Sequence, residues 1–256
     1  MMKKNIKLAV FCNDNFGMKI LEYIKSKKIN LDIIVYDILN KKIKNDIRKK
    51  YKDSLIIGSD KIYQKKNISY FQKLNIDIII LAWWPYILKQ PYLSLPNKYM
   101  INMHPSFLPY GKGKHPYFWS IIENTKFGVS LHVVNNEIDG GKIIARDRIN
   151  IEWVDNGYTL REKSRIKLFL LFKKNFMNII EDKITFIENS KNKRVHYSSE
   201  LEEKSKINLN KRYKAKELLD LIRARSGFKE GASWFIDKKI KYNVKTIITR
   251  VKNEKK

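Results

Sequence analysis

An asparagine and a histidine lie two residues apart at the end of an apolar run, Asn102 and His104 within YMINMH (99–104). In a strand, the period of two points both side chains to the same face. Pro105 then ends the strand, because proline has no N–H to donate to the ladder. An amide beside an imidazole can serve acyl transfer, since one donates to a developing oxyanion while the other shuttles a proton. The structural alternative is that Asn102 caps the loop and His104 is a hydrogen-bonded core histidine.

The elements that would position this pair are short apolar runs that alternate with polar, helix-like segments. Continuous Ile, Val and Leu runs of this length are typical of strands buried on both faces. The segments between them can form crossover helices, so we predict a doubly wound, mostly parallel α/β sheet. The expected strands are 6–12, 31–37, 54–58, 76–84, 99–104, 127–134 and 142–151, and the expected helices are 16–27, 43–50, 69–74, 115–125 and 159–181.

Ligands of a doubly wound sheet bind beyond the carboxyl ends of its strands. The segments 13–17 and 83–86 would lie at that edge, beside the residues that follow the strand of the Asn-x-His pair. The first segment, NDNFG, puts Asn13, Phe16 and Gly17 at a helix start. That position suits a phosphate or a hydroxyl-rich ligand, and it equally suits ordinary helix capping.

The chain changes character after its long helix. Residues 188–210 are polar and charged, which is typical of a linker or of a partly ordered crossing segment. Beyond them, 215–224 has helical periodicity, and 232–251 alternates like a hairpin that turns near 237–239. We therefore predict three parts, a main catalytic domain at 1–187, a linker at 188–210 and a small helix-plus-hairpin subdomain at 211–256.

The composition combines a globular apolar content of 43% with a formal net charge of +27. Such a charge ordinarily indicates nucleic acid, a membrane surface or phosphorylated ligands. Here lysines spread along the whole chain carry most of it, and no aromatic residues cluster on a basic stripe. We therefore favour a solvated lysine surface and expect no nucleic-acid partner. A basic nucleic-acid-binding protein is the alternative outside the enzymes.

The single cysteine, Cys12, excludes an internal disulfide and favours a reducing, cytoplasmic compartment. The four histidines lack the spacing of metal ligands, so we expect no metal. A spanning helix needs roughly 18 apolar residues, and the longest candidate run is interrupted by Asp77 and Pro85. We therefore expect no membrane association.

Residues 99–146 resemble the folate-dependent formyltransferase family, whose catalytic domain carries Asn-x-His-x-Ser-x-Leu-Pro after a strand and an aspartate in a downstream turn. The resemblance covers roughly 1–180 as a fold. The matching residues are Asn102, His104, Ser106, Leu108 and Pro109, with Asp139 in EIDGGKII as the downstream aspartate.

This resemblance implies that Asn102, His104 and Asp139 form the catalytic set. Asn102 and His104 would stabilise the oxyanion as an amine attacks a formyl carbon, while Asp139 orients His104 and helps manage the amine proton. The alternative for Asp139 is a turn residue that accepts its own backbone N–H groups. The resemblance also implies 10-formyltetrahydrofolate as the donor, gripped mainly by backbone of the Asp139 loop and of a loop after the fourth strand. The residues of that second loop are Trp83, Trp84, Pro85 and Tyr86.

The run HPSFLPYGKGKHPYFWSI (104–121) is similar to the sugar N-formyltransferases, which act on dTDP-linked amino dideoxyhexoses for surface polysaccharides such as the O-antigen of lipopolysaccharide. The later segment 215–235 also fits their pattern of a helix followed by a strand, although it lacks the usual prolines after Arg225. The resemblance implies a nucleotide-linked amino sugar as acceptor, with the amine at carbon 3 or carbon 4. It also implies a homodimer to which the hairpin contributes.

Two other members of the family are alternatives. Methionyl-tRNA formyltransferase adds a larger C-terminal barrel, and glycinamide ribonucleotide transformylase ends soon after the long helix. A nucleotide sugar would bring a diphosphate, and Lys112 and Lys114 lie in a loop suited to neutralising it. Tyr117 would face the sugar or the base. The alternatives for these three residues are a solvated basic loop and ordinary core packing.

Overall fold

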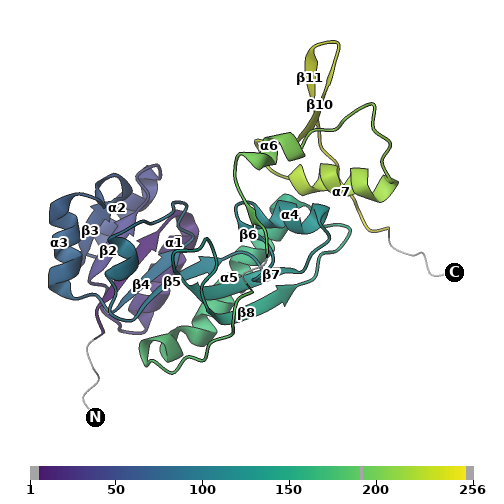
Figure 1. The fold of residues 1–256 in the computed structure, drawn as a ribbon. Helices are drawn as coiled ribbons and strands as arrows, with labels where there is room; N and C mark the ends of the chain where they lie inside the picture. Colours follow the sequence, from purple (N-terminus) through teal and green to yellow (C-terminus); the bar gives the residue numbers. More distant parts are fainter. Residues whose placement is uncertain (1–5, 191–192, 252–256) are drawn as a thin grey trace. The chain divides into compact units, whose positions relative to one another are not determined.

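The computed structural model describes residues 6–190 and 193–251, and the chain divides into two compact units (Figure 1). The first unit comprises Met1–His104, Leu131–Ala145 and Phe169–Asn189, and the second comprises Pro105–Ser130, Arg146–Leu168 and Ser190–Lys256.

The described residues form strands and helices close to those that the sequence predicts. The strands are β1 (Leu8–Cys12), β2 (Ile33–Tyr36), β3 (Leu55–Gly58), β4 (Ile78–Ala82), β5 (Tyr99–His104), β6 (Lys112–Gly113), β7 (Phe127–Val133), β8 (Ile143–Ile149), β9 (Val195–His196), β10 (Ser233–Asp237) and β11 (Ile240–Val244). The helices are α1 (Asp14–Ser26), α2 (Lys41–Lys50), α3 (Lys65–Leu74), α4 (Pro116–Ile122), α5 (Gly157–Ile180), α6 (Glu200–Lys204) and α7 (Ala215–Arg225), with short 3-10 turns η1 (Ser59–Lys61) and η2 (Tyr92–Ser94).

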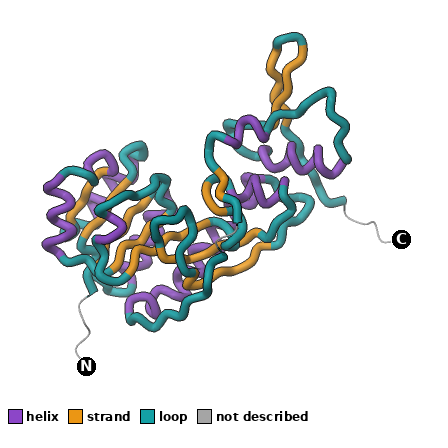
Figure 2. Tube along the Cα trace, viewed as in Figure 1, coloured by secondary structure: helices purple, strands orange, loops and turns teal. Residues whose placement is uncertain are grey.

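Seven strands form one sheet in the order β3-β2-β1-β4-β5-β7-β8. The five strands from β3 to β5 pair in parallel, which confirms the predicted mostly parallel α/β sheet. Figure 2 shows the strands of the first unit between its helices. The crossover helices and the parallel pairing follow from the alternation of apolar runs and polar segments in the sequence.

The two faces of this sheet are covered by different elements. On one face, Phe11 of β1 contacts Phe71 of α3 and Tyr92 of η2, with ring centroids 5.9 and 5.6 Å apart. On the other face, α1 starts so close to β1 that a Cβ on Gly17 would lie 2.6 Å from the Cβ of Cys12. Only glycine permits this approach. Every residue of β1 is therefore buried, as its unbroken apolar run predicts.

The long helix α5 contributes an aromatic stripe to the first unit. Phe172 and Phe176 are fully buried there, as their helical spacing predicts. Both rings contact Tyr23 of α1, at centroid distances of 6.0 and 5.8 Å. This contact fixes α1, and with it the turn between β1 and α1, against the rest of the unit.

The register of the central strands brings three segments of the first unit to one edge. Leu81 of β4 pairs with Asn102 of β5, so the loop after β4 begins beside the end of β5. The Val134 N–H donates to the Met100 carbonyl at 2.7 Å, which places the end of β7 along β5. The carboxyl edge of the sheet is thus where the Asn-x-His pair lies, as doubly wound topology predicts.

The second unit contains the predicted C-terminal helix and hairpin. Helix α7 packs against α4, and β10 pairs antiparallel with β11. Lys238 and Lys239 form the two-residue turn with φ of 45° and 69°, the positive values that a type I′ hairpin turn requires. The predicted turn position near 237–239 is confirmed.

The polar segment 188–210, predicted as a linker, contains the strand β9 and the helix α6. Strand β9 pairs with β6, and the two approach so closely that a Cβ on Gly113 would lie 2.1 Å from the carbonyl oxygen of His196. Two-residue strands and one-turn helices have too few residues for a periodic signal. The domain boundaries at 187 and 210 stay predictions.

Across the described ranges 6–190 and 193–251, no helix combines the length and the apolar character that crossing a bilayer requires.

Candidate active site

Four polar side chains of the first unit meet at the carboxyl edge of the sheet: Asn102 and His104 from β5, His132 from β7, and Asp139 from the loop between β7 and β8. The Asp139 carboxylate is their common partner. Its Oδ1 lies 3.3 Å from Asn102 Nδ2 and 3.3 Å from His132 Nε2, and its Oδ2 lies 3.5 Å from His104 Nε2. These distances are long for hydrogen bonds, as catalytic contacts often are before a substrate binds.

The hydrogen-bond network assigns the protons of His132 and Asn102. His132 Nδ1 lies 3.0 Å from the Val133 carbonyl, which only accepts, so Nδ1 carries the hydrogen and Nε2 of the neutral ring is an acceptor. Asn102 Nδ2 therefore donates one hydrogen to His132 Nε2 at 3.1 Å and the other to Asp139 Oδ1. The approach of His132 Nε2 to Asp139 becomes a hydrogen bond only when His132 is protonated. His132 thus fixes which way the Asn102 amide points.

Burial makes this network electrostatically strong. The side chains of His132, His104 and Asp139 are 2%, 7% and 11% exposed. Charges and dipoles at such depth interact more strongly than in water. A donor aimed at a developing negative charge would consequently stabilise it well here.

The loop that carries Asp139 is held by a residue far along the chain. Asn189, which is 7% exposed, donates from Nδ2 to the Asp139 carbonyl at 2.8 Å and to the Gly141 carbonyl at 3.0 Å. Asp139 itself has a φ of 47°, which an aspartate tolerates better than most residues. A Cβ on Gly141 would lie 1.9 Å from the Val133 carbonyl, so only glycine fits there. Together these features fix where the carboxylate of Asp139 lies.

The loop after β4 shares this edge of the first unit. Trp83 adopts a φ of 60°, and its ring contacts Phe16 at a centroid distance of 5.4 Å. The Trp84 ring belongs to the core cluster and meets Phe11 edge to face at 5.2 Å. Its side chain is therefore committed to packing, which leaves the backbone for the predicted folate contact.

Pro85 is half-buried in the same loop, and Tyr86 is exposed. The Tyr86 hydroxyl donates to Asp37 Oδ1 at 2.9 Å. Partial desolvation of its hydroxyl, followed by this bond to a carboxylate, raises the pKa of Tyr86. Tyr86 is thereby tied to the end of β2.

The predicted ligand residues at the start of α1 have structural roles in the first unit. Asn13 is the N-cap residue, and it makes no side-chain capping bond to the helix. Phe16 is buried beneath Trp83, and Gly17 permits the close approach of α1 to β1. Their predicted contact with a substrate stays a prediction.

The other predicted substrate ligands belong to the second unit. Lys112 is buried and donates from Nζ to the Ser190 carbonyl at 2.9 Å, and the Lys114 N–H donates to the His196 carbonyl. Tyr117 lines a cavity of about 270 Å³ together with Arg161 and Arg225. The sequence predicted Lys112 and Lys114 in one loop, whereas in the structure Lys112 is buried in the short strand β6 and Lys114 follows that strand.

Sequence reasoning did not single out His132 and Asn189. His132 is a polar residue on an otherwise apolar predicted strand, which marks it as a candidate. Assigning it to the site also requires knowing that β7 lies next to β5. Asn189 lies in a polar segment 50 residues from Asp139, and nothing local marks it.

The arrangement combines an amide donor, two imidazoles and a carboxylate within contact distance. Such a set can stabilise an oxyanion and move a proton, which are the requirements of acyl transfer. In the part of the chain that the structure describes, no group of three His, Cys, Asp or Glu side chains could hold a metal ion.

Comparison with known proteins agrees with this geometry. The family model described as "Formyl transferase" matches residues 7–167, and the one described as "N-formyltransferase dimerization C-terminal domain" matches residues 200–250. A methionyl-tRNA formyltransferase of Pelagibacter ubique is 34% identical over 125 residues, which are 48% of this chain and 40% of that protein. The chain thus matches less than half the length of this curated relative.

Two solved structures are similar in fold. A sugar N-formyltransferase from Shewanella sp. FDAARGOS_354 has a TM-score of 0.81 at 18% identity, covering 97% of this chain and 100% of that one. An N-formyltransferase from Helicobacter canadensis, solved with folinic acid and dTDP-3-aminofucose, has a TM-score of 0.67 at 22% identity, covering 86% and 80%. The first family match spans most of the chain and contains Asn102, His104, His132 and Asp139. This chain belongs to the formyl transferase family.

Proposed function

We propose that this protein transfers a formyl group from 10-formyltetrahydrofolate to the amine of a nucleotide-linked amino sugar. The observation that carries the chemistry is the contact of Asn102, His104 and Asp139 at a buried sheet edge. The reaction forms a bond between the acceptor nitrogen and the formyl carbon, breaks the bond to the folate nitrogen, and moves the amine proton to the departing folate nitrogen.

Each residue has a distinct role in this proposal. Asn102 Nδ2 and the His104 imidazole stabilise negative charge on the acyl oxygen. Asp139 Oδ2 faces His104 Nε2, orients the ring and helps remove the amine proton. Because His132 and Asp139 hold both amide hydrogens of Asn102, the acyl oxygen takes one of them when substrate binds.

The folate donor would supply the activated formyl group. One feature of the first unit supports folate binding. The loop 83–86 follows β4, and the register of β4 with β5 places this loop beside the Asn102–His104 pair. Backbone of this loop and of the Asp139 loop would hold the donor, beside the residues that assist the transfer.

The nucleotide sugar as acceptor is supported by the extent of the structural similarity. The sugar N-formyltransferase of Shewanella is covered along its whole length, including the part that aligns with the C-terminal residues of this chain. In the second unit, Arg161 and Arg225 line one cavity with Tyr117, and guanidinium groups suit diphosphate oxygens. We propose Tyr117 and Lys114 as contacts to the nucleotide, with Lys112 supporting the loop.

We also propose that the protein is a homodimer joined through its C-terminal hairpin. A two-stranded hairpin is marginally stable by itself in water. This one exposes Ile236, Ile240 and Tyr242, at 49%, 55% and 43%. The match of residues 200–250 to a dimerization domain supports the same surface.

A substrate panel tests the proposed acceptor. The protein would be incubated with 10-formyltetrahydrofolate and dTDP-, UDP- or GDP-linked amino sugars, glycinamide ribonucleotide or methionyl-tRNA, and products would be identified by mass. We expect formylation of a dTDP-amino-dideoxyhexose with weak dependence on salt, and a raised KM in Lys114→Gln with little change in kcat. Formylation of tRNA alone, with a steep logarithmic salt dependence, would overturn the acceptor and leave the family intact. Tight, salt-sensitive nucleic-acid binding without any formylation would favour the basic nucleic-acid-binding alternative.

A further inference from the structure

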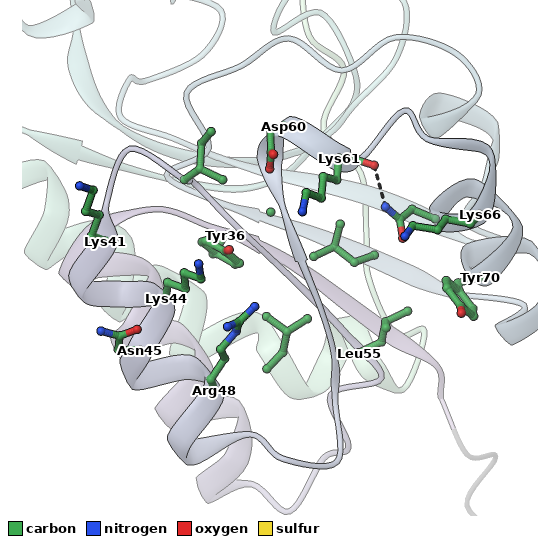
Figure 3. A pocket seen from close by; sticks show the side chains of 15 residues that line it. Tyr36, Lys41, Lys44, Asn45, Arg48, Leu55, Asp60, Lys61, Lys66 and Tyr70 are labelled. Atoms are coloured by element: carbon green, nitrogen blue, oxygen red, sulfur yellow. Dashed lines mark hydrogen bonds between the residues drawn. The ribbon is translucent and has the colours of Figure 1, made fainter.

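The first unit has a cavity of about 720 Å³ at the β3 end of its sheet, lined by residues of α2, β3 and α3 (Figure 3). Its lining is strongly basic. Five of the fifteen lining residues are basic and one, Asp60, is acidic. The basic residues are Lys41, Lys44, Arg48, Lys61 and Lys66.

The positive charge of the cavity lining is denser than the average over the chain. The lining carries a net charge of +4 over fifteen residues, whereas the whole chain carries +27 over 256. None of the five basic side chains forms an ion pair with any residue in 6–190 or 193–251. By contrast, Lys50 of α2, which lies outside the cavity, forms an ion pair with Glu22 at 2.6 Å. The cavity therefore concentrates cations without acidic partners, which favours an anionic ligand.

The side chains of Lys44, Arg48 and Lys61 point toward one space. Lys44 and Arg48 are four residues apart on α2, and Figure 3 shows both side chains directed toward the same region as Lys61. Like charges at this helical spacing repel each other, so a bound anion would relieve a destabilising arrangement. The Asn67 side chain donates to the Lys61 carbonyl at 2.7 Å, which fixes the backbone from which Lys61 extends.

The free edge of β3 adds backbone donors. The Leu55 N–H donates to the Asp32 carbonyl at 2.9 Å, toward β2. Because successive residues of a strand direct their N–H groups to opposite sides, those of Ile56 and Gly58 face the unpaired edge, and both residues line the cavity. Backbone N–H groups beside cationic side chains form a typical anion site.

We propose that this cavity is a second ligand site, for a small anion that carries two or more phosphate or carboxylate groups. It is separate from the Asn102–Asp139 site, because β2, β1 and β4 lie between β3 and β5, which is about 19 Å at the usual strand spacing. The competing explanation is that basic residues beside an edge strand prevent its pairing with other chains. Preventing strand pairing requires only charged side chains at any position along the edge, and it does not require a bound ligand.

Calorimetric titration with pyrophosphate and with citrate tests the proposal. We expect the wild-type protein to bind at least one of them at one site per chain, with a Kd below about 1 mM at low salt. A stronger response to pyrophosphate identifies a phosphate ligand, and a stronger response to citrate identifies a carboxylate ligand. No binding of either anion up to about 10 mM would overturn the proposal.

Matched charge removals on one helix locate the site. Lys44→Gln with Arg48→Gln removes two charges inside the cavity, while Lys42→Gln with Lys49→Gln removes two exposed charges of α2 outside it. We expect the first pair to weaken binding at least tenfold and the second to change it less than twofold. If both pairs of substitutions weakened anion binding equally, the binding would depend on general surface charge, and the proposed site would be overturned. Lys61→Gln gives the same test from a different element should the helix pair fail to fold.

Discussion

The side-chain amide of Asn189 donates to the carbonyl of Asp139 at 2.8 Å across 50 residues of sequence. A second bond from the same nitrogen reaches Gly141 at 3.0 Å. Asn189 thereby holds both ends of the turn that presents the Asp139 carboxylate to Asn102, His104 and His132. Asn189 takes no part in the proposed reaction, yet it fixes the position of the Asp139 carboxylate, which the other three side chains contact.

Replacing Asn189 is therefore predicted to lower turnover without removing a catalytic group. In Asn189→Ala one buried and one partly buried carbonyl lose their donor, so we expect a loss of about 1–3 kcal/mol of unfolding free energy. We also expect a fall of about 10- to 100-fold in kcat, because the Asp139 carboxylate is displaced. Asn175→Ala is the control, since Asn175 also donates from its side chain to a carbonyl, that of Leu171. Equal effects on kcat in both variants would contradict the positioning role.

His132 is predicted to be a positioning residue for Asn102. His132→Phe removes the acceptor at Nε2 and releases one amide hydrogen of Asn102, so the amide can rotate. We expect kcat to fall about 10- to 100-fold with little change in KM. His132→Gln, whose side-chain oxygen can accept the same hydrogen, is expected to restore most of the rate. Steady-state kinetics of the three proteins would measure this, and equal activity in the Phe and Gln variants would contradict it.

The second unit is predicted to lose stability in acid through His115. Burial, followed by the charges of Arg225 and Lys114, lowers the pKa of His115 to about 4. The unfolded chain takes up this proton near pH 6.5, so between these values the unfolded state binds more protons. The free energy of unfolding therefore falls as the pH drops from about 6.5 to about 4, by up to about 2 kcal/mol for a partly exposed group.

Denaturant unfolding of the wild type and of His115→Asn at pH 7 and pH 4.5 measures this contribution. Asparagine tolerates the φ of 56° at this position. Between pH 7 and pH 4.5, the free energy of unfolding should fall less in His115→Asn than in the wild type. An equal loss in both proteins would show that His115 does not titrate in this way.

The hairpin is predicted to hold the dimer together. Ile240→Asp places a charge on the exposed apolar surface of β10 and β11, so we expect a monomer by size-exclusion chromatography with light scattering. Ile247→Asp is the control, because Ile247 is 90% exposed and lies outside the hairpin. A wild type that is already monomeric, or an Ile240→Asp variant that stays dimeric, would contradict the proposed interface.

Much of the fold is predictable because the sheet is buried on both faces. Its strands appear as unbroken apolar runs, and the polar segments between them leave only helices as crossovers. The period of two likewise puts Asn102 and His104 on one face, and the structure brings both to within 3.5 Å of Asp139. These features are local, so the sequence shows them directly.

The unpredicted parts depend on contacts between distant residues. His132 joins the site because β7 lies beside β5, and Asn189 reaches the Asp139 turn from the polar segment after α5. The strand β9 exists only through its pairing with β6. In each case the signal is a pairing between segments, which hydrophobic periodicity does not contain.

The most direct test is the turnover of the wild type and His104→Asn, measured side by side with 10-formyltetrahydrofolate and a dTDP-amino-dideoxyhexose. We predict a formylated nucleotide sugar from the wild type. In His104→Asn, kcat should be lower by a factor of about 100 to 1,000 with the fold unchanged by circular dichroism, because the imidazole acts mainly in the transition state. Near-normal turnover in His104→Asn would contradict the catalytic assignment, and formylation of tRNA or glycinamide ribonucleotide with none on any nucleotide sugar would contradict the acceptor.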